Sequence, residues 1–368
     1  MSIENIAPEY IRAIAPYQGG KPISEIAREY GLNEADIIKL ASNENPLGMS
    51  PNAQVAIGAA IVDVARYPDG NGFELRTAVS RKYGVPQSQI VFGNGSNDIL
   101  ELSARAFLQV GDEAIYSQHA FAVYALVTQA VGATGIVVPA KGYGHDLDGF
   151  LKAITPKTRL IFIANPNNPT GTLIDKTTLA SFLKQVPKNV LVILDEAYDE
   201  YLSSHDKSEA VSWLSTYENL IISRTFSKAY GLAGLRVGFG LMHTDVADIL
   251  NRIRQPFNVN LLAQAAAVAS LADDGFVARS YAANQAGMLQ LTQGLEQLGL
   301  QYIESYANFI SFAVKNAENV NEQLLQHGII VRPIANYDMP DYLRVSIGLF
   351  SENKRFLEAL ALVVKNND

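Results

Sequence analysis

Residues 223–238 read SRTFSKAYGLAGLRVG, and the interpretation of the whole chain depends on this stretch. A short apolar run directly before it is typical of a buried strand. Lys228 therefore follows a strand end, in a loop rich in glycine and hydroxyl side chains. Its amine could form a Schiff base with an aldehyde, while Thr225, Ser227 and Arg236 could hold a phosphate. The alternative is a solvated surface lysine, and this stretch alone does not separate the two readings.

The composition predicts a folded protein with more than one core, because the chain has 368 residues. Hydrophobic residues make up 48% and charged residues 18%, which is the profile of a globular enzyme rather than of a disordered chain. A formal net charge of -8 argues against a surface that binds nucleic acid. The chain has no cysteine, and no histidine stands at metal-ligand spacing from a second ligand. We expect neither a nucleic-acid partner nor a metal site.

The beginning of the sequence and its hydropathy bear on location. The opening residues, MSIENIAPEY, lack the basic segment and the apolar core of a signal peptide. No apolar run approaches the length of a membrane span. We therefore expect a cytoplasmic protein that has no membrane partner.

Short apolar runs recur between residues 89 and 241 and predict a sheet. The runs are continuous rather than alternating, as expected for parallel strands that helices cover on both faces. The predicted strands are Gln89–Phe92, Ala114–Ser117, Ile136–Pro139, Leu160–Ala164, Leu191–Leu194, Leu220–Ser223 and Val237–Leu241. We expect an α/β fold with a mostly parallel, doubly wound sheet of these seven strands, whose ligands lie beyond the carboxyl ends of the strands.

The amino-acid composition and the hydrophobic spacing of the sequence change after residue 260. Residues 261–300 are rich in Ala, Leu and Gln at helical spacing. Three strand-like runs and a terminal helix follow, at 309–314, 329–333, 342–347 and 351–364. We expect an N-terminal arm, a large cofactor-binding α/β domain, and a small α/β C-terminal domain packed with the arm, at residues 1–45, 46–260 and 261–368.

A glycine-containing loop, GNGSND at residues 93–98, follows one predicted strand and opens a predicted helix. Glycines let the backbone fold around an anion, and the free N–H groups of the first helical turn point toward it. The third glycine of the dinucleotide fingerprint is missing. A single phosphate held by Gly95, Ser96 and Asn97 fits better beside Lys228, and a plain strand-to-helix turn is the alternative.

Other polar residues near strand ends suit a pyridine ring. Asp195 follows the most apolar predicted strand, where a carboxylate is costly to bury without a cationic partner such as a pyridinium; helix capping is the alternative. Asn168, in the rigid turn NPNNPTG, and Tyr198 could hydrogen-bond a ring hydroxyl oxygen. Phe121 could stack on the ring or be an ordinary core aromatic. An aldehyde, a phosphate and a hydroxylated pyridine ring occur together in pyridoxal 5′-phosphate, which is the predicted cofactor.

The motifs NPNNPTG, DEAY and SK…GLRVG, in that order, resemble the fold-type-I pyridoxal-phosphate aminotransferases. Further motifs resemble the histidinol-phosphate aminotransferases within this family. They are Pro16–Tyr17, Asn43–Pro46, Arg66–Asp69, Ala307–Phe309 and Leu343–Gly348. The resemblance runs from residue 16 to the predicted C-terminal helix and so covers nearly the whole chain.

The resemblance implies roles for further residues. The lysine would carry the cofactor and shuttle a proton between cofactor and substrate. Tyr67 would reach the cofactor phosphate of a neighbouring subunit, which makes a homodimer the active unit. Arg344 would bind the anionic end of each substrate, and Arg332 and Tyr17 would assist it. Asn43 would lie beside the substrate. An arginine fork suits both a carboxylate and a phosphate, which a reaction with two different substrates requires.

The reaction implied is the transfer of an amino group from L-histidinol phosphate to 2-oxoglutarate, a step of histidine biosynthesis that yields imidazole-acetol phosphate and L-glutamate. Two departures leave the amino donor open: Asn97–Asp98 stands where some members have an acidic pair, and Phe121 where tyrosine is common. Aminotransferases for aromatic amino acids share most of the motifs, and a threonine-phosphate decarboxylase would share the cofactor site. A non-catalytic regulator of this fold is disfavoured, because the short arm has no room for the usual DNA-binding domain.

Overall fold

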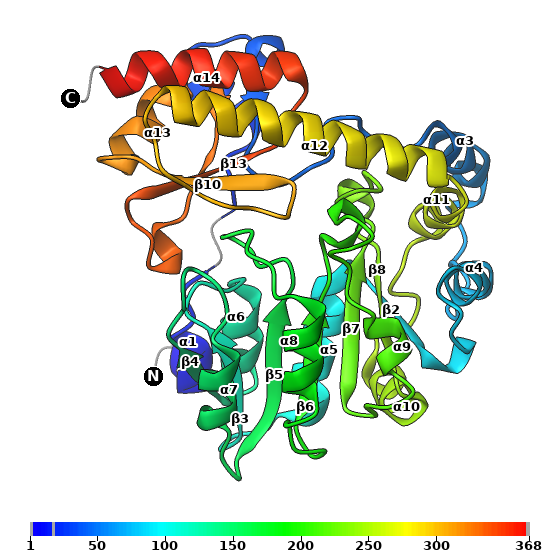
Figure 1. Cartoon of the computed structure of the whole chain (residues 1–368). Coiled ribbons are helices and arrows are strands. Elements are labelled where there is room, and N and C mark those ends of the chain that lie inside the picture. The colour runs from blue at the N-terminus through cyan, green and yellow to red at the C-terminus, as the bar shows by residue number, and fades with distance from the viewer. Residues whose placement is uncertain (1–2, 17–18, 366–368) are drawn as a thin grey trace.

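The computed structural model describes residues 3–16 and 19–365. A large α/β domain forms the lower part of Figure 1 and a smaller domain lies above it. The strands of the large sheet are β2 (Ile90–Gly93), β3 (Glu113–Ser117), β4 (Thr134–Val138), β5 (Thr158–Ala164), β6 (Leu191–Asp195), β7 (Leu220–Thr225) and β8 (Gly238–Met242). Their order in the sheet is β2-β8-β7-β6-β5-β3-β4.

The large sheet is mostly parallel. Strands β4, β3, β5, β6 and β7 run in one direction, and only β8 runs antiparallel to its neighbours β7 and β2 among the described strands. All the predicted strands are present, with ends that differ by a few residues. The predicted mostly parallel, doubly wound α/β sheet is therefore confirmed.

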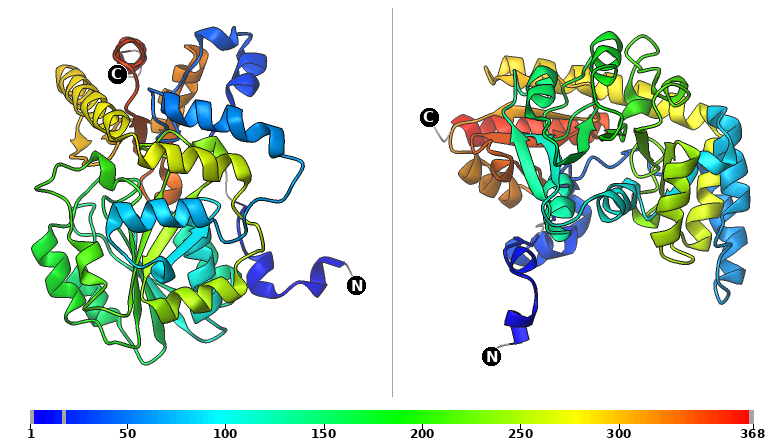
Figure 2. Two further views of the ribbon diagram at one scale, coloured as in Figure 1. Left: turned by 90° about the vertical axis from the view of Figure 1, so that its right-hand side faces the viewer. Right: turned by 90° about the horizontal axis from the view of Figure 1, so that it is seen from below.

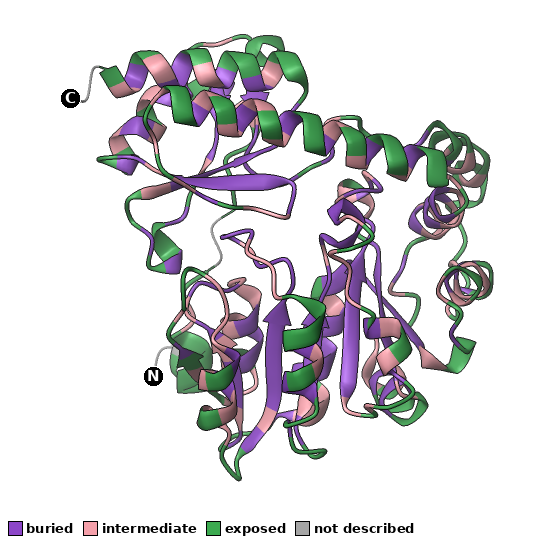
Figure 3. Cartoon of the chain, in the orientation of Figure 1, coloured by how far each residue is buried: buried purple, intermediate pink, exposed green. Residues whose placement is uncertain are grey.

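Helices cover both faces of this sheet, so most strand residues are buried, and the edge strand β4 is the main exception (Figure 3). Along β5, Ile161 and Ile163 face one hydrophobic cluster, whereas Leu160 and Phe162 face the other. This is why the strand sequences are continuously apolar. One face packs against α5 (Ser96–Phe107), α6 (Val123–Ala130) and α10 (Thr244–Ile253). The other packs against α3 (Pro51–Ala60), α4 (Phe73–Tyr83), α7 (Leu147–Ala153), α8 (Lys176–Leu183), α9 (Ala210–Trp213) and α11 (Leu261–Leu271).

The small domain is built on an antiparallel sheet with the order β12-β13-β10-β9. Its strands are β9 (Tyr302–Ile303), β10 (Phe309–Ala313), β12 (Arg332–Pro333) and β13 (Tyr342–Ser346). The helices α12 (Asp274–Gln297), α13 (Ala317–Gln326) and α14 (Phe350–Lys365) pack against it around a core of its own.

The predicted strand at 329–333 is two strands in two sheets, which corrects that expectation. Its first part, β11 (Ile329–Ile330), pairs in parallel with β1 (Ile38–Lys39) of the N-terminal arm. Its second part, β12, joins the antiparallel sheet. The chain divides here because the arm supplies a second strand partner, which the sequence of this segment does not reveal.

The N-terminal arm contacts both domains. Its helix α2 (Ile23–Tyr30) buries Ile26 against Leu325 of the small domain, in the same cluster as Ile330. Its short helix α1 (Glu9–Arg12) lies on α6, where the Gln129 side chain donates a hydrogen bond to the Tyr10 carbonyl oxygen at 3.1 Å. The residues before α1 extend away from the body of the molecule (Figure 2). Short 3-10 helices cover Ile3–Ile6, Glu34–Asp36, Ile61–Asp63, Gln87–Gln89, Asp199–Tyr201, Ala233–Leu235 and Ala335–Tyr337.

Helices α11 and α12 connect the two cores. Ala263 and Ala267 of α11 lie in the core of the large domain, although the sequence prediction assigns residue 261 onward to the small domain. Val277, near the start of α12, packs against the large core, whereas Leu291 and Leu295, near its end, lie in the small one. The boundaries drawn from the sequence stay a prediction. No single helix among the described residues has the length and hydropathy to cross a membrane. Helices α11 and α12 reach them only as a pair, and the pair is bent by 82°.

Candidate active site

The carboxyl ends of β5, β6 and β7 face a cavity of about 210 Å³, which also contacts the small domain and the N-terminal arm. Ligands of doubly wound sheets bind at this edge of the sheet. Most of the predicted site residues line the cavity, although they come from distant parts of the chain. They are Asn43, Ser96, Asn97, Phe121, Asn168, Asp195, Tyr198, Thr225, Ser227, Lys228, Arg236, Arg332 and Arg344.

Two of the predicted residues that the structure describes are not part of this lining. Gly95 lies just behind the wall, where an added Cβ would come within 2.6 Å of the Arg236 guanidinium. Tyr67 is 83% exposed and stacks on Phe257 with a centroid distance of 4.8 Å, so it makes no contact with the cavity of its own chain. Tyr17 lies outside the described residues.

Lys228 lines the cavity from the loop that follows β7. Its Nζ donates a hydrogen bond to the Ser42 carbonyl oxygen at 3.0 Å. Burial and the positive charge of Arg344 lower the pKa of Lys228 to about 8. The loop can approach the segment that follows the N-terminal arm because residue 231 is glycine with a positive φ, and a Cβ there would collide with the Gly48 carbonyl. An amine with a pKa near 8 is partly neutral at about that pH, and the neutral amine is the form that attacks a carbonyl carbon.

Asp195 ends β6 and is buried. The hydroxyl of Tyr124 donates a hydrogen bond to its Oδ2 at 2.9 Å. Its Oδ1 is buried without a hydrogen-bond partner in the part of the chain that the structure describes. Burial raises the pKa of Asp195 to about 6, and the bond from Tyr124 opposes that rise. A buried carboxylate oxygen that faces a cavity suits a cation, such as the protonated nitrogen of a pyridine ring.

Two more predicted ligands are fixed in orientation by hydrogen bonds. The Tyr198 hydroxyl accepts a bond from Asn43 Nδ2 at 3.0 Å. Asn168 Oδ1 accepts a bond from Arg344 Nη1 at 2.6 Å, and the other terminal nitrogen of Arg344 donates to the Ala41 carbonyl oxygen at 2.8 Å. These bonds join the N-terminal arm, the large domain and the small domain around one cavity, and they hold its polar groups in place.

The far end of the cavity has the composition of a phosphate site. Helix α5 begins at Ser96, so the free N–H groups of its first turn face this end. Arg236 Nη1 donates to Ser227 Oγ at 3.1 Å, and no carboxylate in residues 3–16 or 19–365 forms an ion pair with Arg236. A Cβ at Gly238 would lie 2.5 Å from the Ser96 nitrogen, so glycine is needed where β8 passes the helix start. Cationic and N–H groups without an acidic partner fit an anion.

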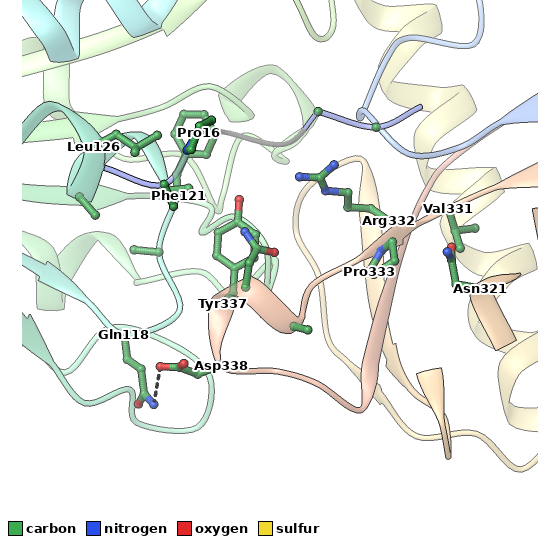
Figure 4. A pocket seen from close by; sticks show the side chains of 18 of the residues that line it. Pro16, Gln118, Phe121, Leu126, Asn321, Val331, Arg332, Pro333, Tyr337 and Asp338 are labelled. Carbon is green, nitrogen blue, oxygen red and sulfur yellow. Dashed lines mark hydrogen bonds between the residues drawn. The ribbon is translucent and has the colours of Figure 1, made fainter. Parts of the chain in front are cut away.

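The two arginines at the other end of the cavity come from neighbouring strands. Arg332 and Arg344 are directly opposite each other in the register of β12 and β13. Arg332 and Phe121 also line a larger adjoining cavity of about 750 Å³. Figure 4 shows this larger cavity, with Arg332 on the small-domain side and Phe121 and Pro16 across from it.

The motifs of the sequence missed a buried ion cluster behind the site. Arg224, near the end of β7, forms ion pairs with Glu196 at 2.5 Å and with Asp199 at 2.9 Å. Glu200 lies 3.7 Å from the same guanidinium, and Lys207 pairs with Asp199 at 3.0 Å. The cluster therefore ties the end of β7 to the turn that directly follows Asp195, the last residue of β6. An arginine near the end of a predicted buried strand was the signal that could have indicated it.

Tyr124 was also missed, although it lines the cavity. It stands in an apolar helical stretch, and nothing in that stretch distinguishes it from a core aromatic. Among the described residues, no group of three or more His, Asp or Glu side chains is arranged to hold a metal ion.

Comparisons with known proteins place the chain among aminotransferases. The model of the family described as aminotransferase class I and II matches residues 35–360. The histidinol-phosphate aminotransferase of Methylobacillus flagellatus is 68% identical over 361 residues, which cover 98% of each chain. Histidinol-phosphate aminotransferase 2 of Nitrosospira multiformis is 60% identical over 369 residues, which cover 100% of this chain and 94% of that protein.

Solved structures agree with these matches. The crystal structure of histidinol-phosphate aminotransferase from Sinorhizobium meliloti in complex with pyridoxal-5′-phosphate superimposes with a TM-score of 0.91 at 26% identity, over 98% of both chains. Aspartate aminotransferase from Thermus thermophilus superimposes with a TM-score of 0.83 at 20% identity, over 97% of this chain and 99% of that one, which shows the shared fold alone. By its sequence and by its architecture, the chain belongs to the class I and II aminotransferase family.

Proposed function

We propose that this aminotransferase uses pyridoxal 5′-phosphate and transfers the amino group of L-histidinol phosphate to 2-oxoglutarate, as a step of histidine biosynthesis. The relatives that are 68% and 60% identical carry this activity in their names. The cavity also has a separate partner for each polar group of the cofactor. Lys228 suits the aldehyde, Asp195 the ring nitrogen, and the start of α5 with Arg236 the phosphate.

The observation that carries the choice of substrate is the pair Arg332 and Arg344. Like charges directly opposite each other destabilise a sheet, so such a pair at a cavity calls for a functional reason. Two guanidinium forks side by side match an anion of charge near −2, such as the phosphate of a phosphorylated amino donor. The second carboxylate of 2-oxoglutarate can use the same forks after the donor has left. An aromatic amino acid offers this pair only a carboxylate of charge −1.

The residues divide the work of the reaction among them. When bound, pyridoxal phosphate supplies an aldehyde that condenses with amines and a ring that withdraws electrons from the substrate carbon. Asp195 Oδ1 keeps the ring nitrogen protonated. Lys228 Nζ removes the proton from the substrate Cα, and a pKa close to the working pH suits a group that must both take and return a proton. Arg344 orients the substrate by its anionic end.

The experiment that tests this proposal is a half-reaction without keto acid. The cofactor-loaded protein is mixed separately with histidinol phosphate, phenylalanine and tyrosine, and the absorbance change of the cofactor is followed. We expect fast conversion with histidinol phosphate and slow conversion with the other two. Comparable or faster conversion with the aromatic amino acids would move the protein to an aromatic aminotransferase, and release of carbon dioxide would indicate a decarboxylase.

We further propose a homodimer in the cytoplasm, in which Tyr67 reaches the cofactor phosphate of the partner. Tyr67 is exposed in the single chain, and so are the apolar side chains of Val62, Val64 and Phe73 near it in sequence. Apolar groups that cluster on a surface favour association. Sedimentation analysis would reveal the dimer, and a monomeric active enzyme would remove Tyr67 from the site.

Arg344→Ala is expected to lower kcat/KM about 30-fold to 4000-fold for both histidinol phosphate and 2-oxoglutarate, because truncating one partner of a buried charge pair costs about 2–5 kcal/mol. The cofactor should stay bound, since its phosphate is assigned to the start of α5 and to Arg236 rather than to Arg344. Steady-state kinetics with each substrate checks this. Arg344→Lys keeps the charge and loses the guanidinium fork, so its kcat/KM should fall between those of the wild type and Arg344→Ala. Unchanged kinetics for both substrates would contradict the role of Arg344.

The rate at which the cofactor-free protein takes up pyridoxal phosphate should depend on pH through Lys228. The neutral amine is the attacking form, and the pKa of Lys228 is lowered to about 8. Uptake should therefore accelerate as pH rises and level off above about pH 9, instead of continuing to rise toward the ordinary lysine pKa of about 10.4. Stopped-flow absorbance measures this rate. A profile that is still rising at pH 10 would show that the site does not lower the pKa.

A further inference from the structure

Tyr124 has a buried hydroxyl group that takes no part in the proposed reaction. It is the second residue of α6, its side chain is 0% exposed, and its hydroxyl donates to Asp195 Oδ2 at 2.9 Å. Burial and the nearby charge of Asp195 raise the pKa of Tyr124 well above 10. The hydroxyl thus keeps its proton at every pH at which the enzyme works, and it is always a donor to the carboxylate.

Packing fixes the position of this hydroxyl. The ring of Tyr124 stacks on Phe162, with centroids 4.9 Å apart and planes 10° from parallel. Its edge meets Phe121 at 5.9 Å, with the rings at 89°. Phe121 in turn lines the cavity. With one neighbour along its face and another at its edge, the ring cannot turn its hydroxyl away from Asp195 without disturbing the core.

The hydrogen bond makes the two oxygens of Asp195 unequal. Oδ2 is occupied by Tyr124, whereas Oδ1 is buried and has no partner within the described residues. Asp195 and Tyr124 both line the cavity. A carboxylate held by one oxygen can rotate little, so its second oxygen presents a fixed acceptor to the cavity.

We propose that Tyr124 is a positioning residue for the cofactor: it holds Asp195 by Oδ2, so that Oδ1 stays ionised and directed at the ring nitrogen. The identity of the ring rests on the proposed function, whereas the bond and the state of Asp195 do not. A phenylalanine at 124 would keep the packing and would remove only the donor.

Few ionisable groups face Asp195. Glu196 follows it in the chain and raises its pKa, and Lys228 lowers it. Besides its donor Tyr124, Tyr198 is also an ionisable neighbour in the described part of the chain. Lys228 changes its charge near pH 8, so measurements at pH 5 and pH 7 leave it a cation at both. Between these two values Asp195 itself changes from mostly protonated to mostly ionised, because its pKa is about 6.

The test measures the stability of the cofactor-free protein by urea titration at pH 5 and pH 7. Hydrogen bonds to an ionised acceptor are roughly twice as strong as those to a neutral one. Tyr124→Phe should therefore weaken the folding equilibrium about fivefold to tenfold more at pH 7 than at pH 5. Phe162→Leu, which loosens the packing on the same ring and leaves the hydroxyl in place, should lose the same amount at both pH values. In an Asp195→Asn background the extra loss of Tyr124→Phe at pH 7 should disappear.

A second measurement concerns the loaded protein. Tyr124→Phe should raise the dissociation constant of pyridoxal phosphate about tenfold and should lower kcat with little change in KM. An equal loss of stability at both pH values, or an unchanged dissociation constant, would overturn the proposal. If the proposed function itself failed, the wild type would transfer no amino group while the difference between pH 5 and pH 7 remained.

Discussion

Replacing Lys228 with alanine is expected to remove the visible absorbance that the protein acquires with pyridoxal phosphate and to lower kcat by at least about 10⁴-fold. The variant loses two functions of one amine. It can no longer bind the cofactor aldehyde covalently, and it has no group to move the proton from the substrate Cα, a contribution of about 10²–10⁴-fold by itself. No other lysine lines the cavity in the described part of the chain, so none can replace it.

The measurement is an absorbance titration with the cofactor, followed by borohydride reduction and mass analysis of the protein. Lys354→Ala is a suitable control, because Lys354 is an exposed lysine of α14 that pairs only loosely with Glu358, at 3.8 Å. This control should keep the full absorbance and activity. A Lys228→Ala protein that still carried a borohydride-reducible cofactor would show that another amine binds it.

Asp195→Asn is expected to lower kcat about 10²-fold to 10³-fold while making the cofactor-free protein more stable. The amide cannot keep the ring nitrogen protonated, and removing one partner of a buried charge pair costs about 3–5 kcal/mol. Without the cofactor, the same buried carboxylate destabilises the folded protein. Its pKa rises from 3.8 to about 6 in the folded chain, which corresponds to about 3 kcal/mol.

The sign follows from proton binding. Between pH 3.8 and about 6 the folded chain keeps the Asp195 proton and the unfolded chain has lost it, so folding becomes less favourable as pH rises. Above about pH 6 the whole deficit is present, and Asp195→Asn should remove it. Urea titrations of the cofactor-free proteins at pH 4 and pH 7 measure the difference. An asparagine variant that gained nothing at pH 7 would show that the carboxylate is stabilised in the cofactor-free protein.

The sequence predicted most of the sheet because buried parallel strands leave a local trace. Residues 160–164 of β5 all pack in the cores on the two faces of the sheet, so a continuous apolar run identifies the strand without knowledge of its neighbours. The strand ends follow in the same way, and with them the cluster of Lys228, Asp195 and Asn168 at one edge of the sheet. Each of these motifs directly follows a predicted strand in the sequence. For this reason the residues of the candidate site could be predicted from the sequence alone.

What the sequence could not give depends on partners that are distant in the chain. The bond from Tyr124 to Asp195 joins residues that are 71 positions apart, and neither segment refers to the other. The split after Ile330 arises because β1 of the arm takes up the first half of that run. The opposition of Arg332 and Arg344 is a matter of strand register, which the two short runs do not specify by themselves.

Helix α12 restricts how such enzymes can exchange parts by recombination. Its first turn packs against the large core and its last turns lie in the small one, so this one helix contributes side chains to both cores. A crossover at residue 260 would join α11 from one parent to a large core from the other, although Ala263 and Ala267 are close-packed there. A chimera would keep its packing only if the parents agreed at both ends of α12. Exchanging one domain alone would therefore disturb the packing at one end of this helix, even though each domain has a core of its own.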